Sequence, residues 1–393
     1  MVVQHNLQAM NANRQLGVTM SGQQKSTEKL SSGYRVNRAA DDAAGLAISE
    51  KMRKQIRGLD QASTNANDGV SAVQTAEGVL NEVHDMLQRM NELAVQAANG
   101  TNSASDREAI QNEIDQLTTE IDRVAETTKF NETYLLKGDG TGDTHSVMLT
   151  AKDGGYGKIQ MKYSTNAKTV NLRLIDLSTG SKVIIGGRQF VIVKESQVNV
   201  KEGKVVVSSA YNMIKKEVQE ANKIGATGQS AKVTVGGSER SLIITRATAI
   251  VKNDLTFALH VGADADENNK IGLRIKSMDT SGLGINGLKV TPGANEDDYG
   301  TAATYAIDAI GDALKIVSDQ RAELGAIQNR LEHTIANLDN VVENTTAAES
   351  RIRDTDMASE MVTYSKNQIL AQAGQSMLAQ ANQSTQGVLS LLG

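Results

Sequence analysis

Side chains that commonly catalyse reactions or bind metals are sparse in this sequence. Its 393 residues contain no cysteine, which excludes a thiolate nucleophile, a disulfide and a cysteine-ligated metal. The sequence has no HExxH arrangement, nucleophile elbow or P-loop. The histidines are spread along the whole chain: His5, His84, His145, His260 and His333. We therefore expect no catalytic residues, no cofactor and no metal site, and no enzymatic activity.

Two patterns imitate ligand-binding loops. The run from Asp264 to Asn269 begins like a calcium-binding loop, but such a loop needs glycine at its sixth position and glutamate at its twelfth. This chain has Asn269 and Ile275 there, so a polar hairpin loop is the better interpretation. The glycine pairs at 186–187 and 236–237 lack the strand-to-helix setting of a phosphate-binding loop. Each pair separates two strand-like runs and predicts a hairpin turn.

The charge balance argues against a nucleic-acid partner. The formal net charge is -5 and the sequence pI is about 5.7, whereas a nucleic-acid-binding domain is basic. One early segment is locally basic, but acidic residues are interleaved with the basic ones, as is typical of an exposed helix surface. We interpret the segment as a solvated or subunit-pairing face. Its basic residues are Lys25, Lys29, Arg35, Arg38, Lys51, Arg53, Lys54 and Arg57, and its acidic residues are Glu28, Asp41, Asp42 and Glu50.

Helical periodicity dominates both ends of the chain. Apolar or small residues recur every three or four positions from Ile48 to Ala94, and the same spacing returns from Leu324 to Ile352. At 1.5 Å per residue, a helix from about residue 49 to about 99 would be on the order of 75 Å long. Its apolar stripe needs partner helices from the same chain or from other subunits. Because only 3% of residues are aromatic, close helix packing should matter more than large buried rings.

Turn-forming residues divide this helical pattern. Gly33 and the residues after it interrupt the periodicity once, and Gly100 ends the long helix. Ser105 and Glu108 predict a capping box at the start of the next helix, whose apolar stripe begins at Ile110.

The composition changes at about Lys137, where strand-like runs begin. The runs are VNLRLIDL, SKVIIGG, RQFVIV, GKVVVSS, AKVTVGG, SLIIT and KIGLRIKSM. A short helix between them, ended near Gly225, has Ala210, Ile214, Val218 and Ala221 on one face. We predict a mixed α/β insert at about 140–255, followed by a segment with β character. Pro292 marks a junction, after which helix resumes at about Ala302.

The outermost segments of the chain are weakly hydrophobic helices. Two interpretations remain open: a terminal helix docked in a monomer, or segments that become ordered when they pack with other copies. The residues we expect to carry such assembly contacts are Leu7, Leu16, Leu30, Ile369, Ala373, Met377, Leu389 and Leu392. The sequence predicts no membrane insertion, and its start has no cleavable signal peptide.

Long ordered blocks at both ends resemble bacterial flagellin. They include KLSSGYRVNRAADDAAGLAISEKMRKQIRGLDQASTNANDGVSAVQTAEG near the start, and ESRIRDTDM and NQILAQAGQSMLAQANQ near the end. The resemblance covers roughly residues 1–136 and 300–393. It implies a mainly α fold in which long antiparallel, coiled-coil-like helices from both termini form a rod with β-hairpin segments. The implied domains are an inner one (1–45 and 350–393), a rod-like one (46–139 and 256–349) and an outer variable α/β one (140–255).

The resemblance also implies a function. A flagellin polymerises into the flagellar filament for motility, and its expected partners are other flagellin subunits, the flagellar cap, hook-filament junction proteins and an export chaperone. Its expected location is the extracellular flagellum, reached by secretion without a cleavable signal peptide.

A host partner is implied as well, because the host flagellin-sensing Toll-like receptor recognises many flagellins. The positions of this chain that match the receptor-binding region are Gln88, Arg89, Leu93, Gln96 and Glu113. The sequence departs from the common family form at Asn91, where arginine is usual, and at its terminal Gly393.

Three alternatives remain beside flagellin. A hook-filament junction protein shares the terminal architecture, but the two C-terminal blocks favour flagellin. A peptidase carried by the insert would need an HExxH or triad signature, which the sequence lacks. A glycan-binding insert would use aromatic side chains, which are few there: Tyr156, Tyr163, Phe190, Tyr211 and Phe257.

Overall fold

The computed structural model describes residues 6–152, 159–162, 168–174, 179–185, 188–194, 197–235, 241–291 and 301–392. The chain divides into two compact units. The first is formed by Met1–Asn65, His260–Asn269 and Thr334–Gly393, and the second by Ala66–Leu259 and Lys270–His333. Two long helices, α2 (Ala43–Ala98) and α5 (Thr301–Arg353), contribute to both units.

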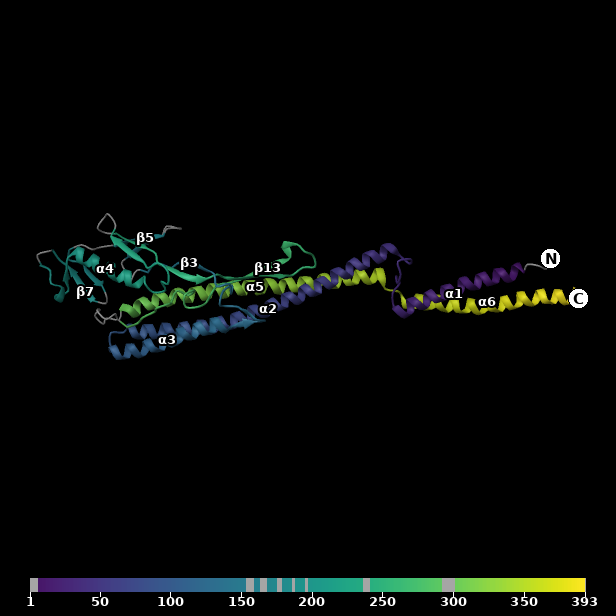
Figure 1. Cartoon of the computed structure of the whole chain (residues 1–393), viewed down its shortest axis with the longest axis horizontal. Helices are drawn as coiled ribbons and strands as arrows, with labels where there is room; N and C mark the ends of the chain where they lie inside the picture. Colours follow the sequence, from purple (N-terminus) through teal and green to yellow (C-terminus); the bar gives the residue numbers. More distant parts are fainter. Residues whose placement is uncertain are drawn as a thin grey trace. The chain divides into compact units, whose positions relative to one another are not determined.

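In the first unit, helix α1 (Leu7–Ser32) and helix α6 (Met357–Leu392) lie side by side and antiparallel (Figure 1). Asn6 at the start of α1 donates from Nδ2 to the Ala381 carbonyl at 3.1 Å. At the other end of the pair, Tyr34 forms a β-bridge with Asp354. Cα atoms of the two helices come within 8 Å of each other, which glycine and other small residues permit.

The segment that follows α1 and the segment that precedes α6 are hydrogen bonded to each other. Helix α1 ends at Gly33, whose φ of 77° is the left-handed conformation that glycine adopts at no steric cost. Arg35 N donates to the Arg353 carbonyl at 2.6 Å, and Thr355 N donates to the Gly33 carbonyl at 3.0 Å. The Arg353 guanidinium lies 4.4 Å from the centroid of the Tyr34 ring, a cation–π contact. The connection from α1 to α2 is thus bonded to the connection from α5 to α6.

The second unit contains most of the helical core. The predicted stripe of α2 is buried at Ala66, Val73, Ala76, Leu80, Val83, Leu87, Met90 and Ala94. Helix α3 (Ala104–Thr127) buries Ile110, Ile114 and Ile121. Helix α5 buries Leu324, Ile327 and Leu331 here. The predicted stripes are therefore confirmed as core at these positions. Elsewhere they are not fully buried: Ile48 is 48% exposed, and Met52, Ile56, Leu59 and Val70 of α2 and Ile335, Val342 and Ile352 of α5 are half-buried.

The turn between α2 and α3 differs in detail from the prediction. The N-cap is Ser103, and the capping box pairs it with Asp106, not Ser105 with Glu108. The helix starts earlier than a box at Ser105 requires, so Ser103 carries the non-helical backbone that a cap needs. Just inside α3, the buried Arg107 donates from Nε to the Ala97 carbonyl at 2.8 Å and from Nη2 to the Asn99 carbonyl at 3.2 Å. A cation therefore satisfies the Ala97 carbonyl in the last turn of α2 and adds a second donor to the Asn99 carbonyl, which also accepts from Asn102 N at 3.2 Å.

The middle of the chain forms small sheets. A tight hairpin, β1 (Lys129–Phe130) with β2 (Thr133–Tyr134), follows α3. One sheet has four strands in the order β4-β5-β10-β9: β4 (Ile159–Lys162), β5 (Thr169–Leu174), β10 (Ser241–Thr245) and β9 (Lys232–Val235). Another has the order β6-β7-β8: β6 (Lys182–Ile185), β7 (Arg188–Ile192) and β8 (Lys204–Val205), the last pairing parallel to β7. Two further pairs are β3 (Thr144–Met148) with β11 (Thr248–Lys252), and β12 (Leu255–His260) with β13 (Lys270–Ile275).

Helix α4 (Val207–Ala221) joins the two larger sheets through one core. Its predicted face, Ala210, Ile214, Val218 and Ala221, is buried. The core members from the sheets include Leu172, Val183, Phe190, Ile192, Val205, Leu242 and Ile244. The chain leaves α4 through Gly225, at φ 81°, where a Cβ would lie 2.3 Å from the Gly284 carbonyl oxygen. Only glycine fits this approach.

Polar contacts attach α4 to the segment after β3 and to α5. Asn222 at the end of α4 accepts from Lys152 N at 2.9 Å and donates to the Lys152 carbonyl at 2.8 Å. The Tyr305 hydroxyl of α5 donates to the Glu217 carboxylate of α4. Burial lowers the pKa of Lys152, and the carboxylates of Asp312 and Asp308 on α5 oppose that shift.

The predicted fold class is confirmed: long helices from both ends of the chain flank a strand-rich middle with mixed α/β content. The run GKVVVSS was predicted wrongly, because only Lys204–Val205 are strand and α4 starts at Val207. Strands β1, β2, β3, β4, β11 and β12 were not predicted as individual runs. Gly186–Gly187, Gly236–Gly237 and Pro292 lie outside the described residues, although the strands flanking each glycine pair are antiparallel neighbours.

The Arg107 contacts generate a stability prediction. Replacing Arg107 with alanine removes two hydrogen bonds to carbonyls and leaves a void beside buried Ala97, so we expect the free energy of unfolding to fall by about 2–4 kcal/mol. Arg123→Ala on the same helix is the control, because Arg123 is exposed and its ion pair with Glu120 contributes little. Urea unfolding of both variants measures the difference. Equal stability of the two would contradict the proposed role of Arg107.

Candidate functional site

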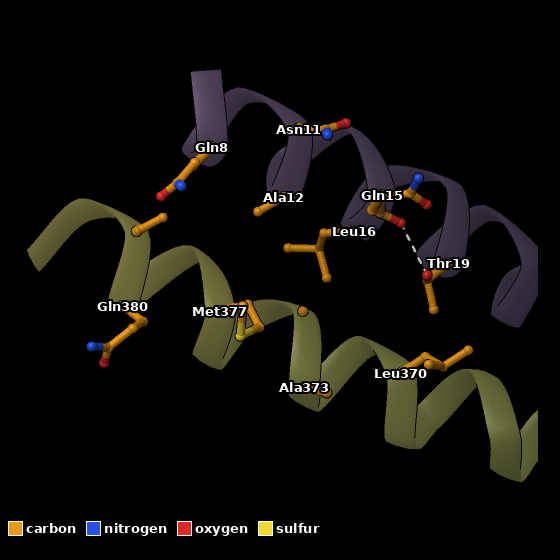
Figure 2. A pocket seen from close by; sticks show the side chains of 12 residues that line it. Gln8, Asn11, Ala12, Gln15, Leu16, Thr19, Leu370, Ala373, Met377 and Gln380 are labelled. Carbon is orange, nitrogen blue, oxygen red and sulfur yellow. Dashed lines mark hydrogen bonds between the residues drawn. The ribbon is translucent and has the colours of Figure 1, made fainter. Parts of the chain in front are cut away.

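The pair of terminal helices encloses a groove that is open to one side. Its volume is about 680 Å³, and Figure 2 shows residues of α1 and α6 facing each other across it. The lining residues are Gln8, Asn11, Ala12, Gln15, Leu16, Thr19, Leu370, Ala373, Gly374, Met377, Gln380 and Ala381. Most of these side chains are small or amidic. The groove therefore has an apolar floor without any charged side chain among its lining residues.

The predicted assembly residues fall into three groups. Leu16 and Leu30 are half-buried within the helix pair. Leu7, Ile369 and Met377 keep 69%, 66% and 63% of their surface exposed, and Ala373 is also exposed. The side chains of Leu389 and Leu392 lie outside the described residues, although both positions belong to α6.

More apolar side chains are exposed on this pair than the sequence analysis identified. The additional ones are Met10, Val18, Met20, Met357, Met361, Val362 and Leu370. They were missed because the search followed a single stripe on each helix, whereas both α1 and α6 expose apolar side chains on more than one side. Exposed apolar surface of this extent marks a site of interaction with other molecules.

A second exposed face lies on α2 and α3. Gln88, Arg89 and Gln96 are exposed, and the Arg89 guanidinium lies 2.8 Å from a carboxylate oxygen of Glu113 and 3.3 Å from one of Glu92. These hydrogen bonds, first that of Glu113 and then that of Glu92, raise the pKa of Arg89. The arrangement presents a fixed guanidinium between two helices.

Leu93 does not belong to this exposed face. Its side chain is only 2% exposed and is part of the α2 core. The structure therefore does not place Leu93 beside Arg89 on the exposed face, and its contact with the receptor stays a prediction. Leu93 follows the buried Met90 by three residues, so the helical repeat carries it to the core side of α2.

The residues that could suggest metal or calcium chemistry have other contacts. His84 is hydrogen bonded to Gln88 at 2.9 Å, and His145 to Asn253 at 3.1 Å. The loop at Asp264 joins β12 to β13, as a polar hairpin loop should. Among the described residues, no three His, Asp or Glu side chains gather as a metal site, and no helix is long and apolar enough to cross a membrane.

Long terminal helices that leave apolar side chains exposed are typical of a protein that associates with other chains. Sequence comparison supplies the family. The model of the bacterial flagellin N-terminal helical region matches residues 3–141, and that of the bacterial flagellin C-terminal helical region matches residues 307–392. A flagellin of Clostridium tyrobutyricum is 45% identical over 98% of this chain and 100% of its own length. The chain belongs to the bacterial flagellins, which are structural proteins and not enzymes.

Other relatives match over the whole chain. A flagellin of Halalkalibacterium halodurans is 41% identical over 100% of both chains. A flagellar filament 33 kDa core protein of Treponema phagedenis is 38% identical over 100% of both chains. The resemblance noted in the sequence is thus confirmed, and the chain is a structural subunit of the bacterial flagellar filament.

The close approach of α1 and α6 yields a prediction. A Cβ at Gly374 would lie 3.3 Å from Leu16 Cδ1, so Gly374→Leu should force the helices apart and weaken their pairing by about 1–3 kcal/mol. Gly17→Leu on α1 is the matched control, since nothing lies within 4 Å of a Cβ there. Both substitutions gain similar helix propensity. Hydrogen exchange of α1 and α6 should be faster in the first variant than in the second, and indistinguishable rates would contradict the steric argument.

Proposed function

We propose that α1 and α6 form the inner contact through which copies of this chain polymerise. The supporting observation is the apolar surface that these helices leave exposed in a single chain, led by Leu7, Ile369 and Met377. Burying a large apolar side chain contributes roughly 1.5–3 kcal/mol. Several such residues on one helix pair can offset the entropy lost when a subunit is immobilised. The docked-monomer interpretation of these helices leaves the same surface uncovered.

We propose that the chain has three domains with different roles in the filament. Residues 1–45 and 350–393 are the inner assembly domain, residues 46–139 and 256–349 the rod-like domain, and residues 140–255 the outer domain. The two ends of the outer range lie close together, because Asp139 N donates to the Asn253 carbonyl at 3.0 Å. Residues 140–255 can therefore be deleted without moving the ends of the remaining chain far apart. A short linker can therefore join residue 139 to residue 256.

The proposal also covers how the subunit reaches the filament. It is secreted to the extracellular flagellum without a cleavable signal peptide, with the export chaperone, the flagellar cap and the hook-filament junction proteins as its partners. Supporting this is the apolar surface that α1 and α6 leave exposed in a single chain, since helices that gain most of their stability from packing with other copies can stay unfolded until they reach them.

A pair of deletions tests the inner contact. Removing residues 365–393 deletes most of α6 and should abolish filaments while leaving the second unit folded. Replacing residues 140–255 with a short glycine–serine linker is the control, and should leave polymerisation largely intact. Electron microscopy after seeding, with circular dichroism of each variant, provides the measurement. Filaments from the variant without residues 365–393 would contradict the proposal.

We also propose that the free subunit is bound by the host flagellin-sensing Toll-like receptor through the exposed face of α2 and α3. Support comes from Arg89, which is exposed, held by Glu113, and flanked along α2 by exposed Gln88 and Gln96. Arginine fixed in this way is typical of residues that dominate protein interfaces. Leu93 acts in this proposal as a core residue that holds α2 straight beneath the contact.

Titration with the receptor ectodomain tests the role of Arg89. Arg89→Ala should weaken binding by about tenfold or more, the usual effect of removing an interface arginine. Arg123→Ala is the matched control, because Arg123 is an exposed arginine with an ion pair of its own on α3. Equal affinity of both variants and the unmodified chain would rule out the proposed contact.

A further inference from the structure

The first unit carries a row of basic side chains without ion-pair partners. Lys51, Lys54 and Arg57 are spaced three residues apart on α2, and all three are exposed. Within the described residues none of them forms an ion pair, whereas neighbouring Arg53 is paired with Glu50 at 3.0 Å. We call Lys51, Lys54 and Arg57 the basic row.

The same unit carries an exposed acidic row on α5, formed by Asp339 and Glu343. Their spacing of four residues places them on one side of the helix. Asp339 accepts a hydrogen bond from Ser63 Oγ at 3.2 Å, and no described basic side chain forms an ion pair with either carboxylate. The exposed neighbours Ala336 and Ala347 are small. The long side chains of a basic row can therefore reach the carboxylates without obstruction.

We propose that the basic row of one copy binds the acidic row of a second copy of this chain. The inference rests on the proposed function, since it assumes polymerisation and names one contact that sets its register. No ion pair joins the two rows within one chain in the described residues, so both remain available to a partner. Because they are different surfaces, each copy offers one row to each of two neighbours, and such a heterologous contact repeats into an open assembly.

Charge explains why this contact should set the register. The chain has a net charge of -5, so copies repel one another on average. The basic row is a local positive surface on this acidic chain, so it attracts acidic side chains of a second copy and offsets part of the repulsion. Opposite charges at such a contact favour one relative position of the copies over others.

A rival acidic partner is the loop between β12 and β13, which carries Asp264 and Asp266. This loop lies against α2 of its own chain, since a Cβ at Gly58 would be 2.9 Å from Ala263 Cβ. Asp266 Oδ1 already accepts from Asn268 N at 3.2 Å. The loop is thus packed on its own α2 and Asp266 already has a hydrogen-bond partner, whereas Glu343 of the acidic row has none within the described residues, which favours the acidic row on α5.

Charge exchange in the full-length chain tests the inference. Lys54→Glu with Arg57→Glu, or Asp339→Lys with Glu343→Lys, places like charges opposite each other, and each pair of substitutions should raise the critical concentration for seeded polymerisation by about tenfold or more. All four substitutions in one chain should return it to within about threefold of the unmodified chain. An equimolar mixture of the two double variants should also polymerise, because each then supplies the charge that the other lacks.

The controls separate this inference from the function on which it rests. Circular dichroism and thermal unfolding establish that each variant folds. If the Lys54→Glu, Arg57→Glu variant does not fold, Lys54→Gln with Arg57→Gln replaces it. Polymerisation of this replacement should depend less on salt concentration than polymerisation of the unmodified chain. Asp264→Lys with Asp266→Lys should neither block polymerisation nor rescue the Lys54→Glu, Arg57→Glu variant. An unmodified chain that fails to polymerise on seeds would refute the proposed function. Normal polymerisation of both double variants, or no recovery in the fourfold variant and the mixture, would overturn the pairing of rows alone.

Discussion

The packing of α1 against α6 is the interaction on which the first unit depends, because it joins the two ends of the chain into one element. Asn6 is bonded to Ala381, and Leu16 lies close to Gly374. Figure 2 shows the two helices side by side around Leu16. Small residues allow this approach, but they bury little apolar area. The same composition that brings the helices together thus leaves their pair unable to complete a core alone.

The helical part of the fold could be predicted well because its signal is periodic. Leu80, Leu87 and Ile114 are fully buried, as their spacing indicated. The capping box was placed too late in the chain because Ser103, Ser105, Asp106 and Glu108 offer two overlapping motifs, and only the backbone at Ser103 decides between them. Local sequence cannot supply that information.

The strands and the candidate contacts were harder to predict. Strand β3 has an exposed side chain at every position, so it lacks the alternation that marks a half-buried strand. Strand β11 alternates in the structure, but its partner β3 lies far earlier in the chain. The burial of Leu93 was not foreseen, because a motif aligned by sequence does not say which side of a helix faces the core. The unpaired state of Lys51, Lys54 and Arg57 became visible only when the partners of the other basic residues were known.

The coincidence of two helix breaks also has a mechanical consequence. The connection after Gly33 lies beside the one at Asp354, and backbone hydrogen bonds tie them together. A bend between Gly33 and Asp354 breaks no hydrogen bond within α1 or α5, because both helices end before this point. A bend placed here would therefore leave the hydrogen bonds within the helices intact. The Arg353–Tyr34 contact, which stacks a cation on a ring without a fixed hydrogen-bond direction, can follow such a bend without losing its attraction.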